Sequence, residues 1–140
     1  MILLDASGLY SAIDSSQPRH DAARRALERE QPPHILSPFA LAELDYLIAR
    51  DAGIEAELGL LAEVGRGTYE LATFEKEDVD VAQDVIARHR DLKIGLIDAS
   101  LVVLAARYET NRILTLDERH FRVLRPRHAK SFVLFPADAP

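Results

Sequence analysis

Apolar residues in this chain are arranged in two alternating patterns. Short uninterrupted apolar runs are typical of buried strands, whereas apolar residues that recur every three or four positions are typical of helices. Strand-like runs occur at residues 2–4, 35–36, 69–71, 113–116 and 131–135. Helical spacing occurs at residues 7–13, 18–30, 38–52, 54–64, 75–90 and 97–108. This alternation predicts an α/β fold with three layers (α/β/α), in which helices cover both faces of a mainly parallel central sheet.

Capping residues set the expected ends of several helices. Ser7 can cap the short helix that follows the first strand. Ser37 and Pro38 suit the N-cap and first position of the third helix, and Gly53 suits its end. Three tyrosines on apolar helical stretches are expected in the core: Tyr10, Tyr46 and Tyr108.

Length and composition indicate one folded domain. The 140 residues, of which 48% are hydrophobic, suit a single domain over residues 1–140 with one substantial core. The absence of cysteine excludes disulfides and thiolate metal sites. Asp5 interrupts the first apolar run and no basic segment precedes it, so we expect no signal peptide. No apolar run approaches a membrane span, so we expect a soluble cytoplasmic protein.

Charge is unevenly distributed along the chain. The net charge is -6, yet residues 107–130 carry seven basic and three acidic side chains. That segment is therefore +4 and the remainder -10. One interpretation is an ordinary solvated basic surface, and the other is a phosphate-facing rim beside an acidic centre.

Four acidic residues occupy positions that either a structural role or a role in a binding site could explain. Asp5 and Asp117 directly follow apolar strands, and Glu43 and Asp98 lie near the starts of otherwise apolar helices. Taken singly, the aspartates could cap helices or turns, and Glu43 could face solvent. Taken together, all four would meet at the carboxyl edge of a parallel sheet, where binding sites form.

Crowded carboxylates repel one another unless a cation offsets their charge. Mg²⁺ prefers oxygen ligands and is usually held by a few carboxylates, and Mn²⁺ suits the same donors. An open cluster of this kind suits phosphodiester hydrolysis, because a bound cation activates water and neutralises charge in the transition state.

Other chemistries find less support in the sequence. The five histidines form no pair with zinc-site spacing, and neither a GxSxG motif nor a glycine-rich phosphate loop is present. A receiver-type signalling domain would need an adjacent acidic pair after the first strand, and a haloacid-dehalogenase-type phosphatase would need DxD there. This chain has Asp5-Ala6-Ser7 at that place.

Four blocks of the sequence resemble the signature blocks of one family, in the same order: LLDASGLYSAID, SPFALAELDYLI, GLIDASLVVLA and ILTLDERHF. They resemble PIN-domain ribonucleases, and the arrangement from residue 2 to about residue 135 is similar to VapC-type toxins of type II toxin–antitoxin pairs. The resemblance implies one PIN-like domain that cleaves RNA as an endoribonuclease with Mg²⁺ or Mn²⁺. A PIN-like scaffold without activity is the alternative, which the presence of all four acids disfavours.

By position, the resemblance makes Asp5, Glu43, Asp98 and Asp117 the metal-binding and catalytic residues. It also implies supporting roles for Ser7 and Thr115, whereas Ala6 departs from the Thr or Ser of many relatives. Relatives of this kind usually form homodimers and are inhibited by a small antitoxin, so both partners are expected. The basic segment fits an RNA-binding rim made of Arg112, Arg119, His120 and Arg122.

Overall fold

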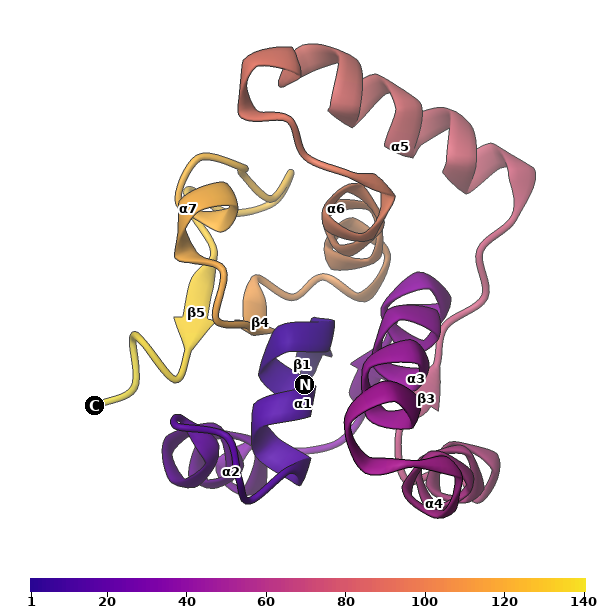
Figure 1. The fold of residues 1–140 in the computed structure, drawn as a ribbon. Coiled ribbons are helices and arrows are strands. Elements are labelled where there is room, and N and C mark those ends of the chain that lie inside the picture. Colours follow the sequence, from indigo (N-terminus) through magenta and orange to yellow (C-terminus); the bar gives the residue numbers. More distant parts are fainter.

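The computed structural model describes all residues from Met1 to Pro140. Its centre is a five-stranded sheet in the order β3-β2-β1-β4-β5, and every neighbouring pair is parallel. The strands are short: β1 Ile2–Leu4, β2 His34–Leu36, β3 Glu70–Leu71, β4 Arg112–Leu114 and β5 Val133–Phe135. The α/β class and the parallel sheet predicted from the hydrophobic pattern are confirmed (Figure 1).

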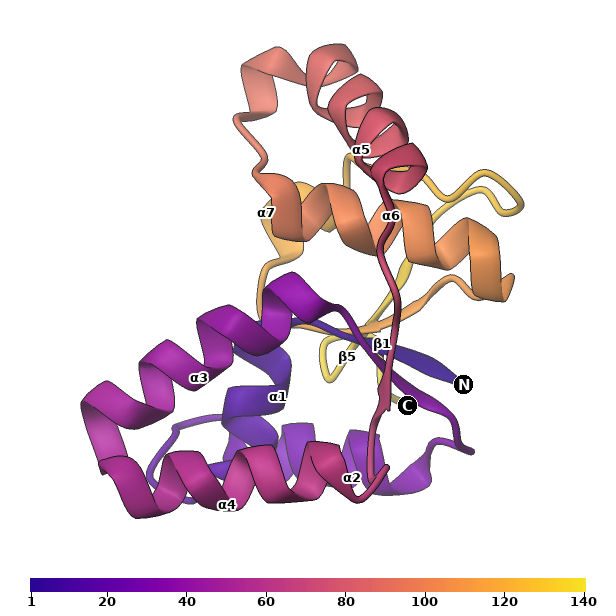
Figure 2. The ribbon, with the colours of Figure 1, turned by 90° about the vertical axis from the view of Figure 1, so that its right-hand side faces the viewer.

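Helices cover both faces of this sheet, which confirms the three layers. Helices α1 to α4 lie on one face, and α5, α6 and α7 lie on the other (Figure 2). The helices are α1 Ala6–Ile13, α2 His20–Arg29, α3 Pro38–Ala52, α4 Ile54–Gly65, α5 Lys76–Arg88, α6 Leu96–Tyr108 and α7 Glu118–Phe121. No helix combines the length and apolar character that crossing a bilayer requires.

The central strand β1 is the middle of the core. Ile2, Leu3 and Leu4 are each 0% exposed, because side chains of a strand alternate between two faces that are both covered. Ile2 and Leu4 join the cluster with α1 to α4, and Leu3 joins the cluster with α6. A strand buried on both faces therefore reads as a continuous apolar run in the sequence.

The register of the strands aligns the carboxyl ends of β1, β2 and β4. Leu4 lies beside Leu36 on one side and Leu114 on the other. The residues that follow these three leucines, Asp5, Ser37 and Thr115, therefore lie at one edge of the sheet.

Two of the predicted local features are wrong. The N-cap of α1 is Asp5, whose side chain accepts a hydrogen bond from the Ala6 amide, and not Ser7. Ser7 is already inside the helix, where its hydroxyl bonds other groups. Tyr46 is 63% exposed and is not a core residue, because it points away from the face of α3 that carries Leu44 and Ile48.

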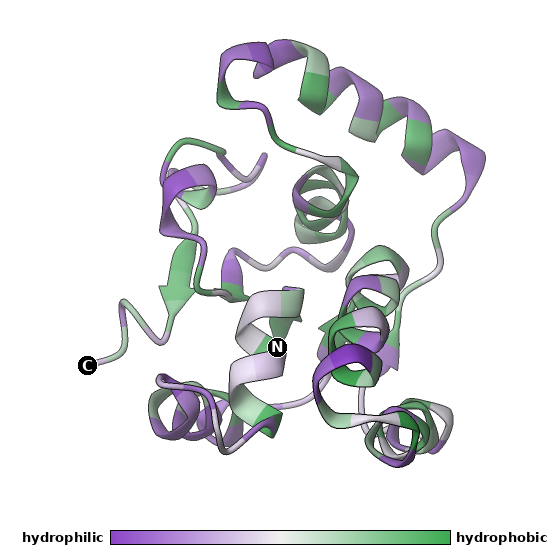
Figure 3. Cartoon of the chain, in the orientation of Figure 1, coloured by the Kyte–Doolittle hydropathy of each residue, from purple (hydrophilic) through white to green (hydrophobic).

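Several boundaries also differ from the hydrophobic pattern. The predicted helix over residues 75–90 ends at Arg88 and is followed by a 3₁₀ turn, Arg90–Leu92. The strand predicted over 113–116 begins earlier and stops at Leu114, because Thr115 and its neighbours turn into the loop before α7. Figure 3 shows hydrophilic and hydrophobic residues mixed along α5, as expected for a helix with one face in water.

Helix α1 approaches β4 so closely that its third residue has to be glycine. A Cβ atom on Gly8 would collide with the backbone carbonyl of Leu114 and lie 2.7 Å from the Thr115 nitrogen. Neither neighbour can move without shifting the strand, since both are backbone groups.

We predict that Gly8→Ala lowers the free energy of unfolding by about 1–3 kcal/mol or more, because the added methyl group overpacks a rigid contact. Urea denaturation measures this change. Gly59→Ala is the matched control: Gly59 lies inside α4 with open space around its Cα, so the same substitution should be neutral or stabilise by about 0.5–1 kcal/mol. Equal effects at the two positions would contradict the close approach of α1 to β4.

Candidate active site

A cleft of about 490 Å³ opens at the carboxyl edge of the sheet. It is lined by residues from α1, α3, α6 and the loops that precede α1, α6 and α7: Asp5, Ser7, Phe39, Glu43, Gly95, Leu96, Ile97, Asp98 and Asp117. All four acids identified from the sequence line this one cleft, although they come from segments far apart in the chain.

Asp5 is the most buried of the four acids, with 6% of its surface exposed. Its Oδ1 accepts a hydrogen bond from the Ala6 amide at 2.9 Å, and its Oδ2 accepts from Thr115 Oγ1 at 2.7 Å and from Ser7 Oγ at 3.2 Å. Burial raises the pKa of Asp5 to about 6, although these hydrogen bonds oppose the rise, and the charge of Asp98 adds to it.

Ser7 and Thr115 connect Asp5 to the end of β4. Thr115 Oγ1 also accepts a hydrogen bond from the Asp117 amide at 2.9 Å, and Ser7 Oγ accepts one from the Leu116 amide at 3.0 Å. The two hydroxyl oxygens are 3.3 Å apart. Both side chains therefore hold the segment that leads to Asp117 against the carboxylate of Asp5. Ala6 contributes only its backbone amide here.

Asp98 stands in the first turn of α6, where the positive end of the helix dipole favours a carboxylate. Its side chain is 14% exposed, and its Oδ2 lies 2.7 Å from Nδ1 of His120. Burial raises the pKa of Asp98, and the charges of Asp117 and Glu43 also raise it, whereas the contact with His120 lowers it. Glu43 therefore acts on Asp98 through its charge.

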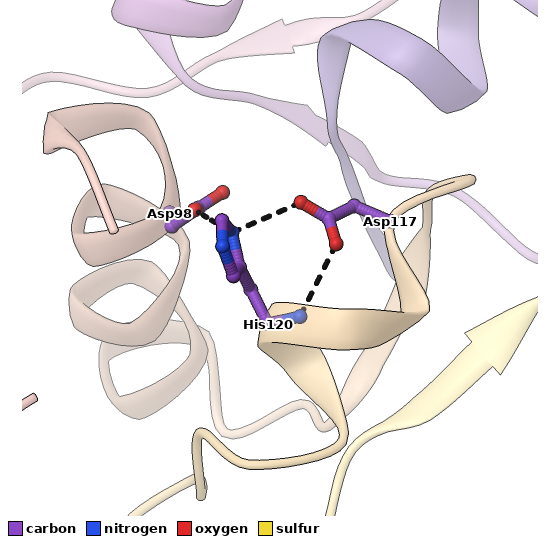
Figure 4. Close-up of side chains that lie close together, drawn as sticks. All are labelled: Asp98, Asp117 and His120. Atoms are coloured by element: carbon purple, nitrogen blue, oxygen red, sulfur yellow. Dashed lines mark hydrogen bonds and ion pairs between the residues drawn. The ribbon is translucent and has the colours of Figure 1, made fainter. Parts of the chain in front are cut away.

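Asp117 caps α7, and this cap brings His120 into the acid cluster. Asp117 Oδ1 accepts a hydrogen bond from the His120 amide at 3.2 Å, and Asp117 Oδ2 lies 3.0 Å from the His120 Nδ1. Figure 4 shows the imidazole between the carboxylates of Asp98 and Asp117. A capping residue and the residue three positions later are neighbours, and this spacing is the sequence signal that points to His120.

Glu43 projects from the second turn of α3 and is the most exposed of the four acids. A buried hydrogen bond that the sequence did not reveal joins its helix to α6. The hydroxyl groups of Ser37, the N-cap of α3, and Ser100 are 2.8 Å apart. This contact fixes the helix that carries Glu43 against the helix that carries Asp98.

The residues predicted to form an RNA-binding rim do not gather in one place. Arg112 lies at the start of β4, at the edge of the sheet opposite the cleft, and therefore does not border it. There its guanidinium binds Glu30, with Nε 3.1 Å from the carboxylate, and covers the ring of Phe135 at 4.4 Å. Arg112 and Asp117 are close in the sequence, but strand β4 runs between them and places them at opposite edges of the sheet.

The other predicted rim residues belong to α7 or follow it. Arg122 pairs with Asp138 at 2.7 Å and with Glu118 at 2.9 Å, which ties the C-terminal segment to α7. His120 faces into the acid cluster, and its side chain is only 20% exposed. Arg119 is exposed and has no ion pair, so it is the one of the three predicted rim arginines that presents a free charge, two residues after Asp117 in the chain.

The donors in the cleft fit a divalent cation. Carboxylate oxygens and an imidazole nitrogen are ordinary ligands for such ions, and Asp98, Asp117 and His120 each offer an atom within 4.8 Å of the others. The raised pKa values of Asp5 and Asp98 show that negative charge is costly here, and a cation would offset it.

Comparisons with known proteins agree with this geometry. A family model described as "PIN domain" matches residues 2–125. Ribonuclease VapC26 from Mycobacterium tuberculosis (strain ATCC 25618 / H37Rv) is 38% identical over 135 residues, which cover 96% of this chain and all of the relative. The crystal structure of Mycobacterium tuberculosis VapC20, titled a sarcin-ricin loop cleaving toxin, superimposes with a TM-score of 0.80. It covers 93% of this chain and 99% of that one at 17% identity, which supports the shared fold. The chain therefore belongs to the PIN-domain family and is a homologue of its VapC ribonucleases.

Proposed function

We propose that this protein is a metal-dependent endoribonuclease and the toxin component of a type II toxin–antitoxin system. In this proposal Asp5, Glu43, Asp98 and Asp117 hold Mg²⁺ or Mn²⁺ and carry the hydrolysis of RNA phosphodiester bonds. The observation that supports it most directly is that these four carboxylates line one open cleft in a chain homologous to a VapC ribonuclease.

Each acid has a distinct structural setting for this role. Asp5 is buried and would bind the cation at the bottom of the cleft, with hydrogen bonds from Ser7 and Thr115 orienting its carboxylate. Asp98 and Asp117 face each other across His120 and would hold the cation from two helices. Glu43 is exposed at the mouth of the cleft, where solvent and substrate can reach it. A bound divalent cation would supply Lewis acidity and positive charge for hydrolysis of the phosphate.

The proposed partners follow from the same charges. The cleft is anionic, so RNA would approach it only where positive charge is present, and Arg119 offers an unpaired guanidinium two residues after Asp117 in the chain. A basic side chain from an antitoxin would be attracted to the same carboxylates. We further propose that the protein forms a homodimer, as its relatives usually do, and works in the cytoplasm, where RNA is available.

The first test is cleavage of total bacterial RNA by purified protein freed from any bound partner. We predict discrete fragments with Mg²⁺ or Mn²⁺ and none with EDTA. Asp98→Asn should reduce the cleavage rate by roughly 100-fold or more, because loss of a ligand exceeds the loss caused by a supporting residue. Asp80→Asn on the exposed surface of α5 makes the same chemical change outside the cleft and should leave the rate unchanged.

Fragments that persist in EDTA, or an Asp98→Asn variant as active as wild type, would contradict the proposed metal site. If Asp80→Asn lost as much activity as Asp98→Asn, the loss of one negative charge, rather than the loss of a ligand, would explain the lower cleavage rate.

Asp5 also makes the stability of the metal-free protein depend on pH. In the unfolded chain it releases its proton near the ordinary pKa of 3.8, whereas in the fold it keeps the proton until about pH 6. Between these values the folded state binds more protons than the unfolded state, so stability falls as the pH rises from about 4 to about 6.

We therefore predict that Asp5→Asn is more stable than wild type at pH 7 in EDTA, by on the order of 2–3 kcal/mol. The difference should shrink as the pH falls from 6 to 4 and vanish well below the ordinary pKa of 3.8, where the wild-type carboxyl is neutral in both states. Urea denaturation of both proteins between pH 4 and pH 7 measures it. Mg²⁺ or Mn²⁺ should then stabilise wild type more than the variant. Parallel pH profiles for the two proteins would refute the proposed cost of the buried charge.

A further inference from the structure

His120 contacts two of the acids that line the cleft, and its imidazole is the one side-chain nitrogen donor placed between them. Its Nδ1 lies 2.7 Å from Asp98 Oδ2 and 3.0 Å from Asp117 Oδ2 (Figure 4). The imidazole therefore lies between the two carboxylates.

The position of this ring is fixed by its own helix. The His120 amide donates a hydrogen bond to Asp117, so the cap that places Asp117 also places His120. Helix α7 is held at its other end by Arg122, which binds Glu118 and Asp138. The nitrogen is therefore held in place before any ligand arrives, and its side chain is only 20% exposed to solvent.

The distances match those between neighbouring ligands of one ion. In an octahedral site with metal–ligand bonds of about 2.1 Å, adjacent ligand atoms lie about 3.0 Å apart. Nδ1 lies 2.7 and 3.0 Å from its two carboxylate neighbours, and one atom from each of the three residues lies within 4.8 Å of the others. A cation could therefore contact all three with small changes in side-chain angles.

We propose that Nδ1 of His120 is a direct ligand of the divalent cation, together with Asp98 and Asp117, and that it makes the site prefer Mn²⁺ to Mg²⁺. This inference rests on the proposed metal-dependent function of the same cleft. In this arrangement Nδ1 would offer its lone pair to the cation, and the ring proton would be carried on Nε2.

Ligand chemistry explains the preference. Mg²⁺ favours oxygen donors and keeps its waters, whereas first-row transition ions accept imidazole readily. Replacing one oxygen by a nitrogen therefore changes the affinity for Mn²⁺ more than the affinity for Mg²⁺. A histidine that only oriented the two carboxylates would affect both ions alike.

The direct test is pulsed electron paramagnetic resonance of Mn²⁺ bound to the full-length protein. Wild-type protein labelled with ¹⁵N-histidine should show hyperfine coupling from a directly bound ¹⁵N nucleus, and unlabelled protein should show the corresponding ¹⁴N signal. This comparison requires no substitution, so it does not depend on how a variant folds.

His120→Asn assigns the signal and measures the preference. The amide nitrogen of asparagine can still donate to the carboxylates but is a poor ligand, so the coupling should vanish. The ratio of the Mg²⁺ to the Mn²⁺ dissociation constant, measured by calorimetry, should fall roughly tenfold. His128→Asn replaces an exposed histidine of the loop after α7 and should change neither quantity.

Bound Mn²⁺ without nitrogen coupling, or equal weakening of both ions in His120→Asn, would overturn the ligand assignment and leave the acidic metal site standing. Failure of wild type to bind either ion would overturn the proposed metal-dependent function as well.

Discussion

Asp5 stands at the end of the central strand β1, where its buried carboxylate accepts hydrogen bonds from Ala6, Ser7 and Thr115. The bond to Ala6 starts helix α1, and the bond to Thr115 joins the ends of β1 and β4. Thr115 in turn binds the amide of Asp117, so the position of that acid depends on the same network. The hydrogen bonds around one buried carboxylate therefore set both the start of a helix and the floor of the cleft.

Capping a helix and lining the cleft are not alternatives for an acid in this protein. Asp5 caps α1 and Asp117 caps α7, yet both line the cleft. A cap uses one carboxylate oxygen to bind a backbone amide and leaves the other oxygen for a different partner. The second oxygen of Asp117 faces His120, and that of Asp5 receives two hydroxyl groups. Helix capping thus places Asp5 and Asp117 at the carboxyl edge of the sheet. Their second carboxylate oxygens remain available to bind other groups in the cleft.

The electrostatics of the cleft favour a bound cation over an empty cluster. Burial and mutual repulsion raise the pKa values of Asp5 and Asp98, so the ionised fold carries a free-energy cost. Two of the arginines predicted near the cleft do not relieve it, because Arg112 lies at the opposite edge of the sheet and Arg122 is neutralised by Glu118 and Asp138. His120 is the one group with basic character that lies among the acids.

The hydrophobic pattern by itself determined the fold class, because strands buried on both faces must be continuous apolar runs and must alternate with helices. The sequence also identified the four acids of the cleft, since parallel strands end at one edge and acids beside apolar runs are conspicuous. It could not determine side-chain direction: Tyr46 turned out exposed, and Ser7 bonds Asp5 instead of capping α1. Only the tertiary structure decided that Arg112 lies at the far edge and that His120 enters the cluster. Proximity along the chain does not fix which end of a strand, or which face of a short helix, a side chain occupies.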